Sequence, residues 1–251
     1  MTELAYLADP EAAYVRVFRA HVTALPPGTV VLDRTFFYPT GGGQPNDLGT
    51  LRSEGGGSVD VVDVTKSGAS VLHRIRGSPG EIQGLTVGLE VEGEVDWPRR
   101  YRHMRLHTAQ HFLSARIFER NGLRTRKAQI AGNGATLDLE GPLPPNAIDL
   151  LATDFEETVA HPRPVRLRHL ARAEWDRNPY ARRTGLVPLP AHVDPVRVVE
   201  IEEYDVCPCG GTHLRSTGEI GAVTLRPPVP VSGGDRVGFT LDDPSRPTPT
   251  G

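Results

Sequence analysis

The residues best suited to chemistry in this chain are two short histidine and cysteine motifs far apart in the sequence. The first is His107-Thr-Ala-Gln-His111, with two imidazoles four residues apart. On a helix such residues share one face, so both rings can reach one metal ion. The second is Cys209-Gly-Gly-Thr-His213, which puts a thiol and an imidazole on either side of a glycine turn. Three nitrogens and one sulfur suit tetrahedral zinc.

The spacing alone leaves two of these ligand positions open. His103 precedes His107 by four residues, so the helical pair could be 103 and 107. Cys207 could replace Cys209 as the thiolate. These two cysteines are the only ones in the chain, and they are too close in sequence to expect a disulfide. A reducing, cytoplasmic setting is therefore expected.

The first motif lacks the general base of the familiar metalloprotease helix, His-Glu-x-x-His. Thr108, Ala109 and Gln110 stand between its histidines, and the nearest carboxylates in sequence are Glu119 and Asp205. This argues against peptide hydrolysis by the usual route. Four protein ligands would also close a tetrahedral zinc, which is typical of a structural site. A catalytic role then requires a displaced ligand or an expanded coordination shell.

Positive charge is concentrated around the first motif. Residues 1–97 hold 7 basic against 13 acidic residues, whereas residues 98–251 hold 21 against 18. Within 98–127 there are nine basic residues and one acid, and a second arginine-rich stretch covers 163–183. Arginine suits bidentate phosphate contacts, so these stretches indicate a phosphate-rich partner. A solvated charged face is the alternative.

A helix must position the histidine pair, and the sequence predicts one over 99–121. The segment contains neither glycine nor proline, carries Leu106, Gln110, Leu113 and Ile117 on one stripe, and is followed by Gly122. A second helix is predicted over 146–160. A strand and turn are expected at 135–145 and strands at 164–172 and 195–205, and residues 219–241 have β character.

The first 96 residues have a different character. Segments 29–39 and 58–65 and those that follow them, to Trp97, read as strands separated by glycine turns, with a glycine-rich loop at 40–49. Segment 11–24 is either a short helix or the entry to a strand. These features predict a small, mostly antiparallel β-barrel. The N-terminus has no signal-peptide pattern and no apolar run is long enough for a bilayer, so no membrane attachment is expected.

Two long segments carry a family resemblance. VDWPRRYRHMRLHTAQHFL (95–113), followed by CGGTHLRSTGEIG (209–221), resembles the editing domain of alanyl-tRNA synthetases. LAYLADP (4–10) and VVLDRTFFYPTGGGQPNDLGTL (30–51) are similar to the β domain of the free-standing alanyl-tRNA editing proteins, the AlaX group of medium length. The resemblance covers roughly residues 4–225.

The resemblance implies an α+β fold: a small N-terminal β-barrel domain (1–97) and a zinc-containing editing domain (98–242). The tail (243–251) is expected to be disordered from its own sequence. It implies a deacylase that removes serine, and in some members glycine, from mischarged tRNA(Ala) while sparing Ala-tRNA(Ala). No nucleotide cofactor and no ATP are expected. By motif position, the zinc ligands would be His107, His111, Cys209 and His213.

The resemblance also implies roles for residues outside the metal motifs. Candidates for the substrate pocket are Gln110, Thr125 and Gln129. The glycine-rich loop that would face the editing site consists of Gly41, Gly42, Gly43 and Gln44. The two arginine-rich stretches supply the candidates for contacts to the tRNA backbone: Arg99, Arg100, Arg182 and Arg183.

Other functions remain open from the sequence. A non-catalytic tRNA-binding module with a structural zinc fits the four ligands and the basic stretches equally well. A zinc hydrolase acting on a small ester fits them less economically. Editing of threonyl-tRNA is a neighbouring possibility, but the CGGTH and GGGQP motifs favour the alanine system.

Overall fold

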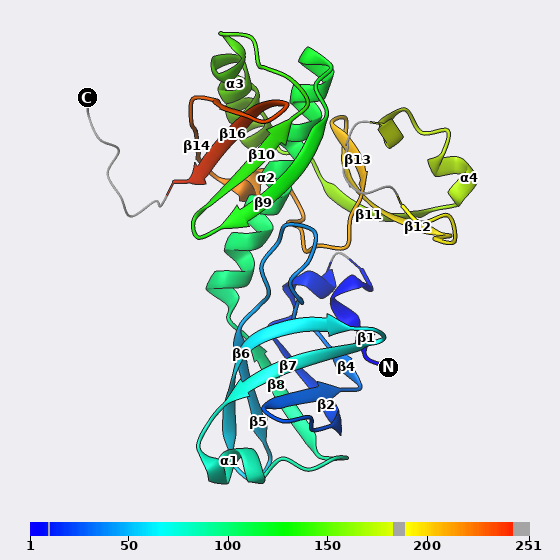
Figure 1. Ribbon diagram of the computed structural model, residues 1–251, viewed down its shortest axis with the longest axis vertical. Helices are drawn as coiled ribbons and strands as arrows, with labels where there is room; N and C mark the ends of the chain where they lie inside the picture. The colour runs from blue at the N-terminus through cyan, green and yellow to red at the C-terminus, as the bar shows by residue number, and fades with distance from the viewer. Residues whose placement is uncertain (10, 183–188, 243–251) are drawn as a thin grey trace. The chain divides into compact units, whose positions relative to one another are not determined.

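The computed structural model describes residues 1–9, 11–182 and 189–242, which fall into two compact units, Met1–His103 and Met104–Gly251 (Figure 1). The predicted disordered tail, 243–251, lies outside the described residues. Among the residues described, no helix combines the length and the apolar character needed to cross a bilayer.

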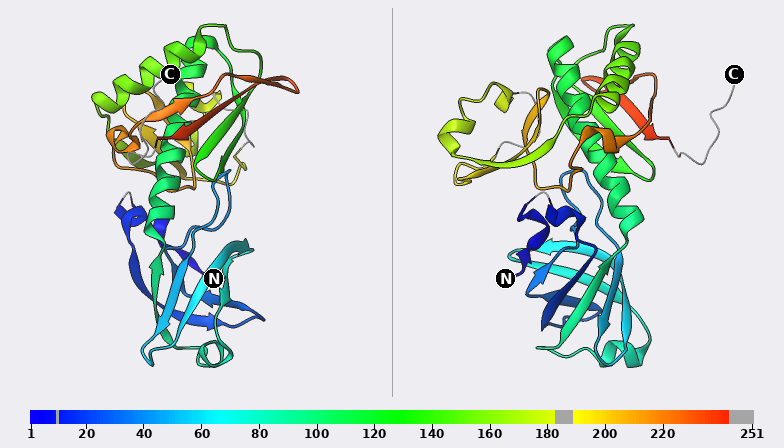
Figure 2. Two further views of the ribbon diagram at one scale, coloured as in Figure 1. Left: turned by 90° about the vertical axis from the view of Figure 1, so that its left-hand side faces the viewer. Right: turned by 180° about the vertical axis from the view of Figure 1, so that it is seen from behind.

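The first unit is a closed barrel, as predicted (Figure 2). Its order is β2-β3-β7-β6-β5-β8. Alternation along the strands sends apolar side chains inward; in β2, for example, Phe18, Ala20 and Val22 are buried. The strands are β2 (Val17–Ala24), β3 (Thr29–Leu32), β5 (Gly49–Ser53), β6 (Ser58–Ser67), β7 (Ser70–Arg76) and β8 (Glu90–Val95).

Short elements complete this unit. Segment 11–24 contains both of the expected alternatives, a 3-10 turn, η2 (Glu11–Tyr14), followed by strand β2. The other short elements are β1 (Glu3–Leu4), which pairs with β4 (Arg34–Thr35), η1 (Ala5–Leu7) and α1 (Pro79–Gln83).

The glycine-rich loop folds into a tight turn. The N–H of Gly41 donates to the carbonyl of Gln44 at 3.1 Å, and the N–H of Gln44 donates back to Gly41 at 2.9 Å. Gly42 and Gly43 have φ of 54° and 81°, a region that favours glycine. The Tyr38 hydroxyl donates to the Gly41 carbonyl at 2.8 Å. The turn is thus rigidly built, while its role at an editing site stays a prediction.

The predicted long helix is α2 (Trp97–Asn121). It begins two residues earlier than expected because Asp96 Oδ1 accepts a hydrogen bond from the Arg99 N–H at 3.1 Å, which caps the first turn. Pro98 is compatible with a first turn, since the N–H it lacks has no intrahelical partner there. The helix ends before Gly122, whose φ is 68°.

In the second unit, α2 runs between two sheets (Figures 1 and 2). The first sheet has the order β14-β16-β10-β9, with β15 also pairing with β16, and the second has the order β11-β12-β13. Helix residues with no exposure are therefore not restricted to one face; they include Met104, Leu106, Phe112, Leu113 and Ile117.

Among the remaining elements, the predicted helix at 146–160 and the predicted strand at 164–172 are present as α3 and β11. Strand β9 was not predicted, and the segment expected as one strand at 195–205 ends at Ile201, before a turn in which Glu203 has φ of 68°. The strands are β9 (Thr125–Ala131), β10 (Gly134–Leu139), β11 (Val165–Leu170), β12 (Val196–Ile201), β13 (Asp205–Pro208), β14 (Val223–Leu225), β15 (Val229–Val231) and β16 (Gly234–Leu241). The helices are α3 (Ala147–Ala160), α4 (Arg172–Trp175), η3 (Pro179–Arg182) and η4 (Thr217–Ile220).

Candidate metal centre

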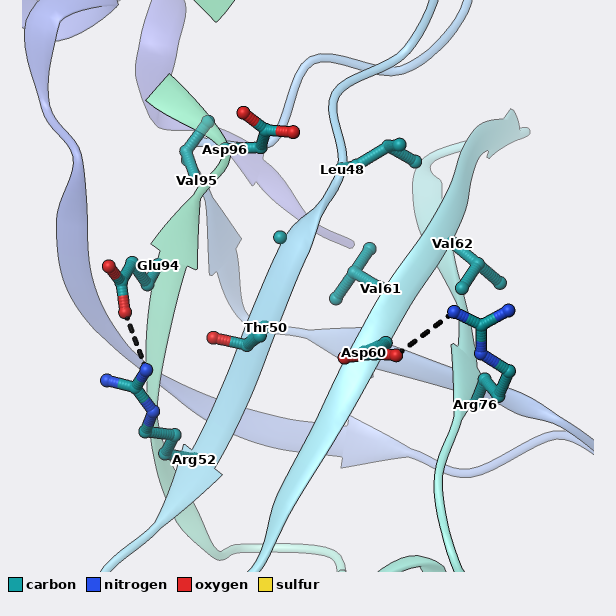
Figure 3. Close-up of a pocket in the computed structure, with 11 residues that line it drawn as sticks. Leu48, Thr50, Arg52, Asp60, Val61, Val62, Arg76, Glu94, Val95 and Asp96 are labelled. Atoms are coloured by element: carbon teal, nitrogen blue, oxygen red, sulfur yellow. Dashed lines mark hydrogen bonds and ion pairs between the residues drawn. The ribbon is translucent and has the colours of Figure 1, made fainter. Parts of the chain in front are cut away.

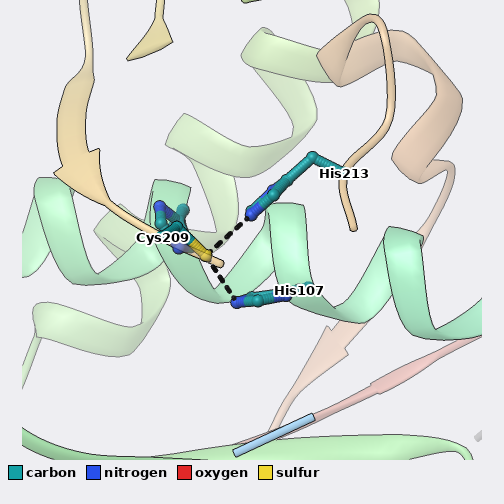
Figure 4. A group of neighbouring side chains, drawn as sticks. His107, Cys209 and His213 are labelled. Carbon is teal, nitrogen blue, oxygen red and sulfur yellow. Dashed lines mark hydrogen bonds between the residues drawn. The ribbon is translucent and has the colours of Figure 1, made fainter. Parts of the chain in front are cut away.

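Both sequence motifs meet in the second unit. His107 and His111 lie one turn apart on α2, and the loop after β13 brings Cys209 and His213 to them. One ligand atom from each of these four residues lies within 4.8 Å of the other three. Cys209 Sγ is 3.5 Å from His107 Nε2 and 3.3 Å from His213 Nε2 (Figure 4). These side chains could hold a metal ion.

The spacing of the donor atoms can be compared with that of a tetrahedral zinc site. With Zn–S near 2.3 Å and Zn–N near 2.05 Å, a tetrahedral angle separates sulfur from nitrogen by about 3.6 Å. The observed S···N distances of 3.5 and 3.3 Å are close to this value. Three imidazoles and one thiolate are also a donor set that zinc prefers. The residues therefore fit zinc in both number and chemistry.

The loop that carries Cys209 is held by its own backbone and by the sheet. The Cys209 N–H donates to the carbonyl of Arg197 on β12 at 3.4 Å. The Gly211 N–H donates to Cys209 Sγ at 3.3 Å, as backbone amides do at anionic sulfur. The short motif thus turns tightly enough for its last residue, His213, to reach the sulfur.

Two of the rings are also held by their second nitrogen. His111 Nδ1 donates to Asp205 Oδ2 at 2.9 Å, and Asp205 is almost completely buried. His213 Nδ1 lies 3.2 Å from the hydroxyl oxygen of Thr108, which also accepts a hydrogen bond from the Leu214 N–H at 3.2 Å. Both contacts leave Nε2 directed at the cluster.

The charges in the cluster favour a thiolate. Burial raises the pKa of the Cys209 thiol, but His107 and His213 lower it by more, so that its pKa falls well below its usual range. Burial lowers the pKa of His111, but hydrogen bonds to Asp205 and Cys209 raise it to about 9. Burial and the neighbouring His107 lower the pKa of His213 to about 3. The thiolate is the form of cysteine that binds metals.

His103 and Cys207, the two alternative ligands that the sequence left open, both lie outside the four-residue group. His103 is buried but belongs to neither of the potential ligand groups found among the described residues. Cys207 is buried and forms a second group with His111 and Asp205. The structure therefore gathers the four side chains named by motif position, and Cys207 adjoins them through His111.

The predicted pocket residues fall into two environments. Gln110 and Thr125 are buried: the Gln110 amide donates to the carbonyl of Thr136 at 3.1 Å, and the Thr125 and Ser114 hydroxyls lie 2.7 Å apart. Gln129 is exposed on β9 and lines a cavity of about 360 Å³ on the sheet. It therefore does not share the buried surroundings of the histidines.

Arg100 requires a correction, because it was expected to contact the tRNA backbone. It is completely buried in the first unit, and its Nε lies 3.0 and 2.9 Å from the two carboxylate oxygens of Asp47. Its other nitrogens donate to the carbonyls of Ala13 and Phe36. The guanidinium is thus fully engaged inside the protein and unavailable to a phosphate.

The other predicted tRNA contacts stay predictions. Arg99 is half-buried, and its Nε donates to the carbonyl of Asn46 at 2.9 Å. Arg183 lies outside the described residues, as does the side chain of Arg182.

Many of the other arginines in the two basic stretches are paired with acids. On α2, Arg116 and Arg120 both bind the carboxylate of Asp154 on α3. These pairs reduce the positive charge that the composition alone suggested. The pairs in the second stretch are Arg163–Glu203, Arg166–Glu202, Arg168–Glu200 and Arg172–Asp176.

A cavity of about 550 Å³ lies on the first unit, along β5 and its neighbours (Figure 3). Thr50 stands between two ion pairs, Arg52–Glu94 at 2.9 Å and Arg76–Asp60 at 3.2 Å. All four charged side chains are substantially exposed. Because such exposed pairs are solvated, the groove has the character of an ordinary barrel surface.

Comparisons with known proteins cover most of the chain. The family described as tRNA synthetases class II (A) matches residues 13–99, and the family described as threonyl and alanyl tRNA synthetase second additional domain matches residues 196–239. The chain is similar to alanyl-tRNA editing protein AlaX-M of Methanosarcina acetivorans, with 38% identity over 90% of this chain and 92% of the relative. It is also similar to the protein of that name from Methanosarcina barkeri, with 37% identity over 90% of this chain and 92% of the relative. The alanine–tRNA ligase of Pyrobaculum neutrophilum is 36% identical over 86% of this chain, but over 24% of the ligase.

Proposed function

Since the chain belongs to the family of alanyl-tRNA editing proteins of the AlaX-M type, we propose that it is an aminoacyl-tRNA deacylase that hydrolyses Ser-tRNA(Ala). Gly-tRNA(Ala) is a second substrate within the proposal, and Ala-tRNA(Ala) is spared. The observation that carries the proposal is the convergence of His107, His111, Cys209 and His213 in a member of this family. Hydrolysis of an ester needs no ATP, and we expect the reaction in the cytoplasm.

In this proposal the four residues hold zinc. When bound, the ion would supply positive charge that polarises the ester carbonyl and positions the substrate. The chain's own contribution is to keep Cys209 as a thiolate and to hold the histidine rings in place through Asp205 and Thr108. An ester needs less help with its leaving group than an amide does, so the lack of a glutamate between the two histidines is compatible with this reaction.

Discrimination of serine from alanine depends on a single hydroxyl. A site that hydrogen-bonds this hydroxyl can reject the analogue without it by as much as ~10⁴-fold, because the polar groups of the site are then left unpaired. Gln110 and Thr125 are the better candidates for this contact, since they are buried polar residues. Gln129, which is exposed, is the weaker candidate.

The test is the hydrolysis of Ser-tRNA(Ala), Gly-tRNA(Ala) and Ala-tRNA(Ala) by purified protein, with zinc content measured in parallel. We expect loss of serine, retention of alanine, and loss of both activity and zinc in Cys209→Ala. A folded, zinc-loaded protein that hydrolyses none of the three esters would contradict the proposal. That outcome would favour a tRNA-binding module with a structural zinc, which the four protein ligands also suit.

A further inference from the structure

We propose that Asp205 and Thr108 are positioning residues that fix the tautomers of His111 and His213, so that both rings present Nε2 to the metal. The inference rests on the proposed zinc site and adds two residues to it. Neither residue was expected to bind the metal, and neither belongs to the group of His107, His111, Cys209 and His213.

The argument for Asp205 begins with proton positions. A carboxylate only accepts hydrogen bonds, so the imidazole nitrogen 2.9 Å from Asp205 Oδ2 must carry the proton. That nitrogen is Nδ1 of His111, and the lone pair of the neutral ring is then on Nε2. A buried carboxylate that holds the outer nitrogen of a histidine is a recurrent support of metal sites, because it fixes the orientation of the ring and raises its basicity.

Thr108 acts on His213 in a similar way. Its hydroxyl oxygen accepts from the Leu214 N–H at 3.2 Å, which fixes the position of this oxygen beside the ring. His213 Nδ1 lies 3.2 Å from the same oxygen, while His213 Nε2 lies 3.3 Å from Cys209 Sγ. With a proton on Nδ1, the ring donates to Thr108 and leaves Nε2 free for the ion.

The Asp205–His111 and Thr108–His213 contacts both join α2 to β13 and the loop after it, but the supporting residue comes from a different side in each. Asp205 begins strand β13 and holds a histidine of α2, whereas Thr108 lies on α2 and holds a histidine of the loop that follows β13. Helix α2 and the segment 205–213 therefore each provide two of the proposed ligands and a support for a ligand of the other. This arrangement accounts for a buried carboxylate and a buried hydroxyl that the proposed reaction does not otherwise use.

The experiment compares zinc affinities by competition with a chromophoric chelator in the full-length protein. Thr108→Val removes the hydroxyl at nearly constant volume, and Thr108→Ser restores it. Asp205→Asn keeps the shape of the side chain but removes its charge. We expect Thr108→Val and Asp205→Asn each to weaken zinc binding by about 10–100-fold, and Thr108→Ser to bind about as tightly as wild type.

Two further measurements separate positioning from loss of folding. The metal-free Thr108→Val and Asp205→Asn variants should keep the circular dichroism and the cooperative unfolding of the metal-free wild type, at a lower temperature because each loses a buried hydrogen bond. The Co²⁺-substituted Asp205→Asn protein should show an altered visible spectrum. Wild-type affinity in both Thr108→Val and Asp205→Asn would overturn the inference, as would equal weakening in Thr108→Val and Thr108→Ser. A wild-type protein that binds zinc but does not deacylate Ser-tRNA(Ala) would overturn the proposed function alone, and one that binds no zinc would overturn both.

Discussion

At the scale of single residues, metal binding by the four-residue cluster requires that each histidine direct Nε2, and Cys209 its Sγ, toward the same point. The spacing of His107 and His111, and of Cys209 and His213, could be predicted from the sequence because helix periodicity and a short glycine turn are local properties. The contact between His111 and Asp205 could not, since it joins residues 94 positions apart. From the sequence alone, Asp205 is only one of the two carboxylates nearest to the first motif.

The two cysteines should behave differently although they are close in sequence. Cys209 lies within reach of three imidazoles, whereas Cys207 reaches the cluster only beside His111 and Asp205. We expect Cys207→Ser to keep one zinc per chain and its deacylase activity, and Cys209→Ser to lose both. Zinc content by atomic emission and deacylation of Ser-tRNA(Ala) measure the difference. Equal loss in the two variants would contradict the assignment of the thiolate.

His73, inside the barrel, should make the protein less stable in acid. Burial lowers its pKa to about 4, although the carbonyl of Val30 acts in the opposite direction. Unfolding returns the pKa to about 6.5. The unfolded state therefore binds more protons below that pH, and stability falls as the pH drops from about 6.5 toward 4.

This loss amounts to about 2 kcal/mol between pH 7 and pH 5. His73→Gln does not titrate but can still pair with Val30 and Thr35, which hold the ring at 3.0 and 2.9 Å. Urea unfolding of wild type and variant at both pH values gives the contribution of His73 by difference. The same pH dependence in both proteins would show that His73 is not responsible.

At the scale of elements, the sequence predicted α2, α3 and the barrel because their patterns are long and periodic. It missed β9 because TRKAQIA alternates poorly and is exposed at four of its seven positions. The predicted start of α2 at Arg99 is two residues too late because the prediction covered only the segment without proline, whereas the Asp96 cap and Pro98 are compatible with a first turn at Trp97. Most of the arginine pairs were also missed because they join residues far apart in the sequence; Arg116–Asp154 and Arg166–Glu202, for example, span 38 and 36 positions.

Strand pairing in the barrel requires glycine at position 49. A Cβ at this position would lie 2.0 Å from the Glu94 carbonyl oxygen and 2.8 Å from the ring of Phe37. Because a backbone atom on the paired strand cannot move aside, we expect Gly49→Ala to lower the free energy of unfolding by about 3 kcal/mol or more.

Gly80, in α1, is the matched control. A Cβ there meets no atom within 4 Å, so Gly80→Ala should be neutral or slightly stabilising. Urea denaturation of both variants measures the difference. Equal stability of the two variants would mean that the barrel relaxes more readily than its strand register indicates.

At the scale of the whole molecule, the distribution of charge is more even than the sequence suggested. Composition revealed two arginine-rich stretches, but it could not reveal that Asp154 pairs with two arginines of the first, or that glutamates of 200–203 pair with three of the second. A basic surface therefore has to be sought among the arginines and lysines without acidic partners.

Binding of tRNA should distinguish paired from unpaired arginines. Arg102 is exposed and has no acidic partner among the residues that the structure describes, whereas Arg166 is paired with Glu202. An arginine paired with an acid has less charge to offer a phosphate than an unpaired one. We therefore expect Arg102→Gln to reduce the slope of the logarithm of the tRNA association constant against the logarithm of the salt concentration by about one, and Arg166→Gln to leave this slope nearly unchanged. A filter-binding salt series measures both slopes; the reverse order would contradict this view of the charge.

The long separation in sequence between the two motifs means that a metal bound to both would cross-link the chain. His107 and Cys209 are 102 positions apart, so an ion that joins them closes a loop of about 100 residues, as a disulfide would. In the chain-entropy description, such a closure removes about 4–5 kcal/mol of freedom from the unfolded ensemble. An ion bound there would thus be a reversible cross-link, and its four ligands would be complete only after His213 has left the ribosome. A nascent chain that ends before Cys209 would carry half of the ligands and none of the topological constraint.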